Sequence, residues 1–298
     1  MVEKTLAALI ALLGLAAAPA LAQAAAKAPF PVTIKAANGA VTIKARPTRI
    51  VSLSPTATET LFAVGAGSQV VAVDDQSNYP ANAPRTKLSG YTPNAEAIAG
   101  YNPDLVVVSN DGGLVSSLQK LGLTVLLEPA AANLPQAYDE IRQLGAATGH
   151  EERSTGVVKS IQVQITKLIR SVPKRSRHLK VFHELEPDLY SATSSTFIGA
   201  IYKTFGFKNI ADAADSSHTG YPQLSVEYVV SSSPDIVVLA DTKCCGQSAK
   251  TVGARPGWAS VSAVEHHRVI NVDDDIASRW GPRIVDFVRL VANAAKRS

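Results

Sequence analysis

Two glutamates, Glu96 and Glu227, occupy equivalent places in a stretch that the chain carries twice. In each copy a helix-capping residue, Asn94 or Ser225, precedes the glutamate by two positions, and six more residues lead to a Pro-Asp pair and an apolar run. Asparagine and serine at such a position accept hydrogen bonds from the first turn of a helix. The positive end of the helix dipole stabilises a carboxylate placed there. The repeat therefore predicts two helices that each carry an acid in the first turn.

The sequence lacks the motifs of the common enzyme classes. It contains no Walker phosphate loop and no Gly-x-Ser-x-Gly nucleophile elbow. Gly65 and Gly67 form only a fragment of a dinucleotide-binding loop, and His266 and His267 are adjacent rather than at the helical spacing of metal ligands. We therefore expect no enzymatic activity. The competing hypothesis of a secreted hydrolase needs a nucleophile and a base in one cleft, and no such pair is evident.

The two cysteines, Cys244 and Cys245, are neighbours in the chain. In an oxidising compartment they can form a disulfide that stiffens a loop, but they cannot join distant parts of the protein. Two adjacent thiols are also a poor ligand set for zinc, which takes four ligands. We expect a structural role for this pair rather than a redox role.

Polar loops follow several predicted strands, and they contain the side chains best suited to hold a small molecule. In open α/β sheets, ligands bind at the carboxyl ends of the strands. Polar loops on two lobes without a catalytic set therefore favour a ligand cleft between the lobes. The candidate ligand-binding residues are Tyr91, Tyr190, Tyr221, Asp275, Arg279 and Trp280.

The elements that must position these residues form two similar α/β halves. Each copy of the repeat ends in an unbroken apolar run, residues 105–108 and 236–239, which is typical of parallel strands covered on both faces. A length of 298 residues is ample for two lobes of ordinary size. We place the N-terminal lobe at residues 45–133 and the C-terminal lobe at residues 173–298.

The segment between the lobes, residues 134–172, has apolar residues three or four positions apart, which predicts a helix that joins the lobes. Gly145 and Gly149 are points where this helix could be interrupted. At the other end, residues 23–44 contain a loose stretch followed by a β-hairpin, whose alternating strands flank Asn38 and Gly39.

Residues 1–22 have the features of a cleaved signal peptide. Lys4 precedes a short apolar run, and the small residues Ala20 and Ala22 fit a cleavage site. The run is short for a membrane span. We expect an exported protein that is soluble after cleavage, in the periplasm, the cell envelope or outside the cell. The net charge of +4 comes from scattered residues, which indicates no nucleic-acid-binding surface.

Residues 49–67 resemble the solute-binding proteins of ABC importers for cobalamin, ferric siderophores and haem. The likeness continues through residues 78–80, both copies of the repeat, residues 205–206 with 209–210, and residues 279–283, and so covers nearly all of the chain after the signal peptide. The resemblance implies two Rossmann-like lobes joined by a single long helix, with the ligand between them and only small closure on binding.

The resemblance also implies a role for the repeated glutamates. In this family one exposed glutamate on each lobe pairs with arginines of the permease dimer, and Glu96 and Glu227 stand at those positions. Two charges far apart on one rigid body fix the orientation of a complex. We therefore expect a monomer without an intrinsic cofactor that delivers a metal chelate to an ABC permease in the cytoplasmic membrane.

The sequence leaves the ligand open between a cobalamin-type corrinoid and a ferric siderophore. By resemblance, Tyr91, Tyr190 and Tyr221 fall near aromatic residues of the family's pocket, and Asp275 and Arg279 fall near polar contacts. An anionic siderophore favours arginine ligands, for which the chain offers Arg85, Arg255 and Arg279.

Haem and a bare metal ion are two further candidate ligands within the same class of protein. A haem-binding protein needs an axial ligand, and Tyr91 or His183 is available for this role. A receptor for bare zinc or manganese needs histidines that converge, so His183 and His218 would have to meet across the cleft.

Overall fold

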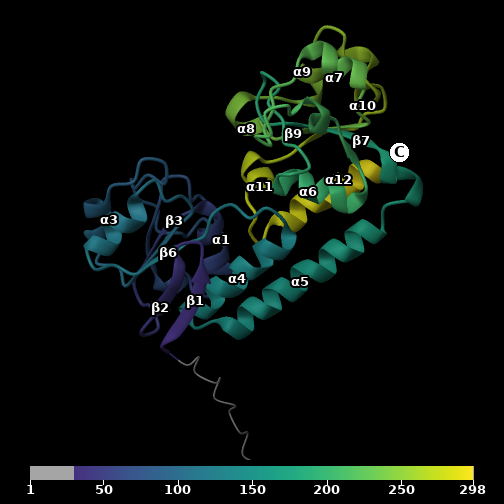
Figure 1. Ribbon diagram of the computed structural model, residues 1–298. Helices are drawn as coiled ribbons and strands as arrows, with labels where there is room; N and C mark the ends of the chain where they lie inside the picture. The colour runs from purple at the N-terminus through teal and green to yellow at the C-terminus, as the bar shows by residue number, and fades with distance from the viewer. Residues whose placement is uncertain (1–29, 298) are drawn as a thin grey trace, which may run out of the picture.

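The computed structural model describes residues 30–297, so the expected signal peptide at residues 1–22 lies outside the described part of the chain. The chain forms two lobes, each built on a four-stranded parallel sheet, and an antiparallel hairpin on the N-terminal lobe (Figure 1). This confirms the two-lobed α/β architecture expected from the repeated stretch. Between residues 30 and 297, no helix has the length and apolar character that crossing a membrane requires.

The N-terminal lobe and the helices beneath it contain the first half of the elements. In chain order they are β1 (Val32–Ala36), β2 (Gly39–Ile43), β3 (Ile50–Leu53), α1 (Pro55–Ala63), the 3₁₀ helix η1 (Gly67–Gln69), β4 (Val70–Val73), α2 (Ala95–Ala99), β5 (Leu105–Val108), α3 (Leu114–Lys120), β6 (Val125–Leu127), α4 (Leu134–Thr148) and α5 (Glu151–Arg170). The strand order of the sheet is β4-β3-β5-β6, and all its neighbours are parallel.

The C-terminal lobe contains the remaining elements. They are η2 (Lys174–His178), β7 (Lys180–Glu184), α6 (Phe197–Phe205), β8 (Lys208–Asn209), η3 (Ile210–Ala214), α7 (Val226–Ser232), β9 (Ile236–Leu239), α8 (Thr242–Cys245), α9 (Ala249–Gly253), η4 (Trp258–Ser260), α10 (Ser262–Glu265), β10 (Val269–Asn271), α11 (Asp274–Ser278) and α12 (Ile284–Lys296). The strand order is β10-β9-β7-β8, again parallel.

The two copies of the repeat form the same structure in both lobes. The Asn94 side chain caps α2 by accepting the N–H of Ala97 at 2.7 Å, and the Ser225 hydroxyl caps α7 by accepting the N–H of Tyr228 at 3.1 Å. Each helix then leads to a buried central strand, β5 beside β3 and β9 beside β7. The duplication in sequence is therefore a duplication of local structure.

The aspartate of each Pro-Asp pair anchors its copy to the first strand of its sheet. Asp104 accepts the backbone N–H of Arg49 at 3.0 Å, and Asp235 accepts that of Lys180 at 2.8 Å, in both cases across 55 residues of chain. The side chains of the same two basic residues also bond back to the repeat. Arg49 donates to carbonyls that follow α2, and Lys180 donates to the carbonyl of Ser232 at the end of α7. Because both helices are anchored in the same way, Glu96 and Glu227 have equivalent positions relative to the sheets of their lobes.

A single long helix, α5, carries the chain from one lobe to the other, as Figure 1 shows. The helical segment expected at residues 134–172 is nevertheless divided, because α4 ends before Gly149 and α5 begins at Glu151. Gly149 has φ +75°, a left-handed conformation that glycine adopts readily and that ends an α-helix. The chain reverses there, so α4 packs against α5 and against α1 and β1 of the N-terminal lobe.

Two glycine-to-alanine changes in the linking helices are expected to change the free energy of unfolding in opposite directions. A Cβ on Gly145 of α4 would lie 2.2 Å from the Ser154 hydroxyl oxygen on α5, whereas a Cβ on Gly156 would meet nothing within 4 Å. We expect Gly145→Ala to lower the free energy of unfolding by about 1–3 kcal/mol, because it forces the helices apart. We expect Gly156→Ala to raise it by about 0.5–1 kcal/mol through helix propensity. Urea denaturation of both variants checks this, and equal effects would contradict it.

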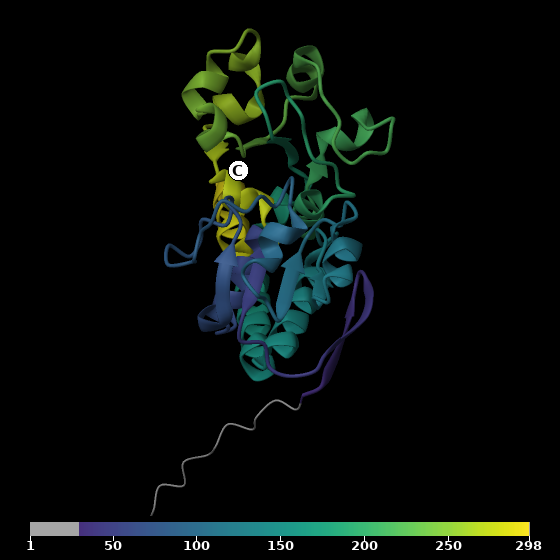
Figure 2. The ribbon, with the colours of Figure 1, turned by 90° about the vertical axis from the view of Figure 1, so that its left-hand side faces the viewer.

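One hydrophobic cluster is shared by the two lobes, in addition to a separate cluster within each lobe. Figure 2 shows the C-terminal lobe above the N-terminal lobe, with α12 (yellow) where they meet. The core's largest buried cluster is continuous from one lobe to the other, and it includes Leu61, Val107, Ile141, Ile161, Val238 and Val291. Wide opening of the lobes would expose this core at a cost of about 25 cal/mol per Å². The continuous core therefore supports the expectation of small closure.

Candidate functional site

The two repeated glutamates are exposed at matching places. Glu96 is the second residue of α2 and Glu227 is the second residue of α7, and both side chains are open to solvent. Both helices precede the central strand of their sheet and run antiparallel to it, so their first turns lie at the carboxyl edges of the two sheets. The chain thus presents one carboxylate on each lobe, and the helices that carry the two carboxylates are capped and anchored in the same way.

A pocket of about 340 Å³ lies in the N-terminal lobe, where α2 and α3 begin. Tyr91, Asn94 and Glu96 line one part of it, and Asn110 and Asp111, which follow β5, line another. The Tyr91 side chain is 94% exposed. The structure therefore brings a candidate ligand residue and a candidate docking residue to the same pocket, which the sequence did not predict.

Two further tyrosines, Tyr190 and Tyr221, lie on neighbouring segments of the C-terminal lobe. The segment of Tyr190 pairs with the segment that follows Tyr221, since Tyr190 forms a β-bridge with Gln223 and Ser191 donates to the carbonyl of Pro222 at 3.0 Å. Tyr190 is 38% exposed and Tyr221 is 49% exposed. Partial burial raises the pKa of Tyr221, so its hydroxyl stays protonated and offers a hydrogen-bond donor.

Asp275 and Arg279 are together, but Arg279 faces the other lobe. Its guanidinium donates to Glu59 of α1 at 2.8 Å, to the Asn78 side chain at 2.9 Å and to Asp275 at 2.6 Å. Only 8% of Arg279 is exposed. Burial favours a higher pKa for Asp275, but hydrogen bonds from Asn78 and Lys243 and the charge of Arg279 lower it below its usual value. The pair therefore belongs to an ion network between the lobes.

Glu59 is the centre of this network and was missed at the level of sequence. It is almost fully buried and also binds Arg283 through both carboxylate oxygens, one of them at 2.8 Å from Nε. The Arg283 guanidinium in turn lies 4.2 Å from the centre of the Tyr79 ring. One signal was available, since Glu59 is the only charged residue of α1. A lone charge in a buried helix requires a partner.

Trp280 points toward α4. Its indole N–H donates to the Glu140 carboxylate at 2.6 Å, and the side chain is half-buried. A second buried acid, Glu128, follows β6 close to Glu140. Burial, and secondarily the charge of Glu140, raises the pKa of Glu128 to about 8, while burial raises that of Glu140 to about 7. The structure thus places Trp280 in a contact between the lobes.

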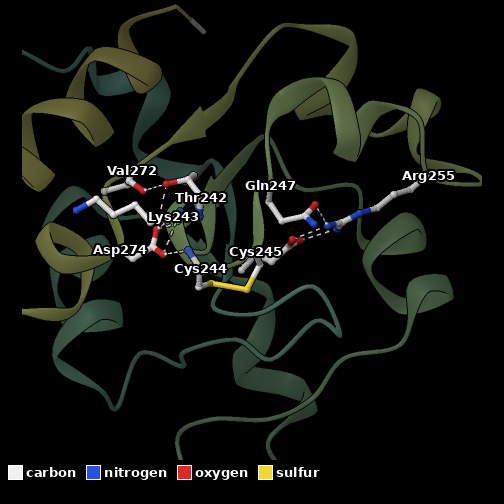
Figure 3. The surroundings of a disulfide bond; sticks show 9 residues. Thr242, Lys243, Cys244, Cys245, Gln247, Arg255, Val272 and Asp274 are labelled. Atoms are coloured by element: carbon white, nitrogen blue, oxygen red, sulfur yellow. Dashed lines mark hydrogen bonds and ion pairs between the residues drawn. A yellow bond between two sulfur atoms is a disulfide. The ribbon is translucent and has the colours of Figure 1, made fainter. Parts of the chain in front are cut away.

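The adjacent cysteines Cys244 and Cys245 form a disulfide on α8, and the structural role expected for them stays a prediction. Figure 3 shows Asp274 on one side of this helix and Gln247 with Arg255 on the other. The Asp274 carboxylate accepts the N–H groups of Thr242, Lys243 and Cys244 at 2.9–3.1 Å. The Asp274 carboxylate therefore holds the first turn of α8, and with it the exposed disulfide, beyond the carboxyl end of β9.

Lys243 connects the disulfide helix to the ion network. Its ammonium lies 2.7 Å from Asp273 and 3.0 Å from Asp275. The hydrogen bond to Asp273 is the main cause of a raised pKa for Lys243, so the charge persists. A chain of contacts thus runs from α8 through Asp275 to Asn78 of the N-terminal lobe, which donates to Asp275 at 2.8 Å.

His183 does not reach a cleft, contrary to the expectation that it could be a ligand. It is fully buried on β7, where it shares a hydrogen bond of 2.6 Å with the Tyr202 hydroxyl and packs against Phe287. Burial lowers the pKa of His183 to about 3, which keeps the ring neutral. Across residues 30–297, no three His, Cys, Asp or Glu side chains gather as a metal-binding group.

The comparisons with known proteins agree on one family. A family model described as periplasmic binding protein matches residues 50–276. The chain is 34% identical over 276 residues to an uncharacterized ABC transporter substrate-binding lipoprotein, YvrC, of Bacillus subtilis (strain 168), and the match covers 89% of this chain and 85% of that protein.

Two further matches carry ligand names. A cobalamin-binding protein of Halobacterium salinarum is 31% identical over 275 residues, which is 89% of this chain and 74% of that protein. Among solved structures, the periplasmic vitamin B12 binding protein BtuF of Vibrio cholerae aligns with a TM-score of 0.69 at 25% identity, over 84% of this chain and 96% of that one.

Proposed function

This chain belongs to the periplasmic binding protein family, and from that premise we propose that it captures a cobalamin-type corrinoid and delivers it to an ABC permease. As a family member it is a substrate-binding protein of the type that serves importers of vitamin B12, haem or siderophores. The corrinoid and the residues that bind it are our proposal. We place the ligand between the lobes, with Tyr91 on one side and Tyr190 and Tyr221 on the other.

One observation carries the choice of a corrinoid over an anionic ferric siderophore. The candidate tyrosines are exposed, whereas the arginines best placed for an anion are already paired within the protein. Arg255 binds Glu184 through two bonds of 2.6 Å, and Arg279 binds Glu59 at 2.8 Å. A corrin ring presents a broad face that aromatic rings can cover without a charge. A ferric siderophore remains the second candidate, through Arg85, whose side chain bonds only a backbone carbonyl among the contacts described.

Haem, a bare metal ion and a hydrolytic substrate each have less support than a chelate of these two kinds. Haem would have to use Tyr91 as its axial ligand, because His183 is enclosed in the core. The same burial removes His183 from a bare zinc or manganese site with His218. A hydrolase would need a nucleophile beside a base, and the relatives reported above are a substrate-binding lipoprotein and a cobalamin-binding protein.

Ligand titration of the purified mature protein tests the proposal. Absorbance and tryptophan fluorescence are followed with cobalamin, several ferric siderophores, haem and zinc. We expect cobalamin to bind, and we expect alanine at Tyr91, Tyr190 or Tyr221 to weaken binding about threefold to tenfold each. Leu121→Ala is the control, because Leu121 is exposed at the other end of α3 from the pocket. Binding of siderophores alone, or of free metal alone, would contradict the corrinoid assignment.

A further inference from the structure

The disulfide helix α8 is the counterpart in the C-terminal lobe of residues 110–113 in the N-terminal lobe. The two sheets have matching strand orders, β4-β3-β5-β6 and β8-β7-β9-β10, so β5 corresponds to β9. Residues 110–113 follow β5, and α8 follows β9. Both segments therefore lie at the carboxyl edge of a parallel sheet, where ligands of α/β proteins bind.

The counterpart segment in the N-terminal lobe lines a pocket together with a tyrosine. Tyr91 and residues 110–113 all belong to the pocket of about 340 Å³ where α2 and α3 begin. In the sequence, a Gly-Tyr pair that ends at Tyr91 precedes Glu96, and a second Gly-Tyr pair that ends at Tyr221 precedes Glu227. Tyr221 thus corresponds to Tyr91, and the duplication pairs the disulfide with Tyr221.

Polar contacts connect α8 to the opposite lobe. Lys243, which precedes the disulfide, lies 3.0 Å from Asp275, and Asp275 accepts a hydrogen bond of 2.8 Å from the Asn78 side chain of the N-terminal lobe. Helix α8 also contacts α11, which carries Asp275, and the two helices are neighbours in Figure 1. The disulfide therefore lies next to the boundary between the lobes, where we place the ligand.

The disulfide is an apolar element in a polar loop. Cys244 and Cys245 are both exposed. Because their sulfur atoms are bonded to each other, they carry no thiol proton and no charge. Sulfur is polarisable and makes favourable contacts with flat aromatic systems. The Asp274 carboxylate holds the first turn of α8 through three N–H groups, so the sulfur atoms are positioned before a ligand binds and little conformational freedom is lost on contact.

We propose that the Cys244–Cys245 disulfide is a contact surface for the bound corrinoid, beside Tyr221 and on the opposite side of the ligand from Tyr91. The inference rests on the corrinoid ligand proposed above, and it adds a binding role for the two cysteines. Two linked sulfur atoms and their methylene groups cover part of a broad ring face without a charge. The sulfur–sulfur bond stays intact in this role, so no electron transfer is involved.

Titration of the full mature protein with cyanocobalamin measures the contribution of the disulfide to affinity. Replacing both cysteines by serine, Cys244→Ser with Cys245→Ser, exchanges the apolar sulfur atoms for hydroxyl groups, and we expect binding to weaken about threefold to tenfold. Leu121→Ala, at the end of α3 far from the pocket, is the control and should bind as the unmodified protein does. Circular dichroism verifies that each variant is folded.

Protection of a thiol separates a ligand contact from the stiffening of a loop. In Cys244→Ser the remaining thiol of Cys245 reacts with N-ethylmaleimide. We expect cyanocobalamin at about ten times its Kd for this variant to slow the reaction about tenfold, because only the unbound fraction stays accessible. Both axial positions of its cobalt are occupied, so the thiol has no coordination site on the metal. The control thiol is introduced by Glu151→Cys, in the exposed first turn of α5 with both native cysteines replaced by serine, and its reaction rate should not change.

The outcomes distinguish failure of this inference from failure of the proposed function. If cyanocobalamin binds the double serine variant as tightly as the unmodified protein, or leaves the reaction of Cys245 unchanged, the disulfide is not a ligand contact and the inference is wrong, although the corrinoid assignment stands. If cyanocobalamin does not bind the unmodified protein, the corrinoid assignment fails, and the inference fails with it.

Discussion

Replacing Glu96 and Glu227 together by alanine is expected to abolish ligand uptake by cells while leaving the affinity for the ligand intact. Both side chains are exposed, and equivalent helices hold them on the two lobes. A pair of fixed charges that meets arginines on a two-fold permease determines the orientation of the complex, and its loss prevents productive docking. Uptake of labelled ligand by cells that express each variant measures the first effect, and titration of the purified variant measures the second.

The chain offers a matched control for this experiment. Glu151 and Glu152 are also exposed acids, the first two residues of α5, and their double replacement removes the same charge from the first turn of a helix. In both double variants the free energy of unfolding falls by about 0.3–1 kcal/mol per site, because a favourable interaction with the helix dipole is lost. Stability therefore does not distinguish the two variants. Only the variant at Glu96 and Glu227 should lose uptake. Because Glu96 shares a pocket with Tyr91, ligand affinity must be measured directly, and its loss would overturn the docking assignment.

Docking through two distant contacts requires that the two lobes stay fixed relative to each other. The buried cluster that runs through α4, α5 and α12 holds both lobes against one core. The ion network from Glu59 to Asp275 adds a polar connection beside it. These two connections would keep the spacing between Glu96 and Glu227 constant, although the two glutamates belong to separate sheets.

Features that depend on local sequence were predicted well. Capping residues, a Pro-Asp pair and apolar runs fixed both copies of the repeat, because helix caps and buried strands depend on residues a few positions apart. The hairpin at Asn38 and Gly39 followed from the same kind of signal. Gly149 was recognised as a possible interruption, yet the reversal between α4 and α5 depends on packing that a helical pattern does not contain.

The features that could not be predicted from the sequence depend on contacts between residues far apart in the chain. Arg279 lies 220 residues from Glu59, and Trp280 lies 140 residues from Glu140. An arginine and a tryptophan in a polar loop have the composition of a ligand site, and only the fold shows that both side chains are engaged by the other lobe. His183 illustrates the same limit, since a histidine at the end of an apolar strand can face either a cleft or a core.

Arg279→Ala is expected to lower the free energy of unfolding by about 3–5 kcal/mol. The substitution removes a buried guanidinium and leaves Glu59, which is 3% exposed, with Arg283 alone as its charged partner. Asp275 loses its 2.6 Å bond at the same time. Glu59 keeps its bonds to Arg283, but a buried carboxylate that loses one of two charged partners still costs more than the loss of an exposed ion pair. Urea denaturation monitored by circular dichroism measures the change.

Arg289→Ala on α12 is the matched control for this prediction. It removes the same side chain from an exposed pair with Asp286, and such pairs contribute about 0–1 kcal/mol. Arg279→Lys should give an intermediate loss, because lysine keeps the charge but cannot bond Glu59, Asn78 and Asp275 through one planar group. If Arg279→Ala instead unfolds like the unmodified protein and binds ligand at least tenfold more weakly, Arg279 is a ligand residue and not a connection between the lobes.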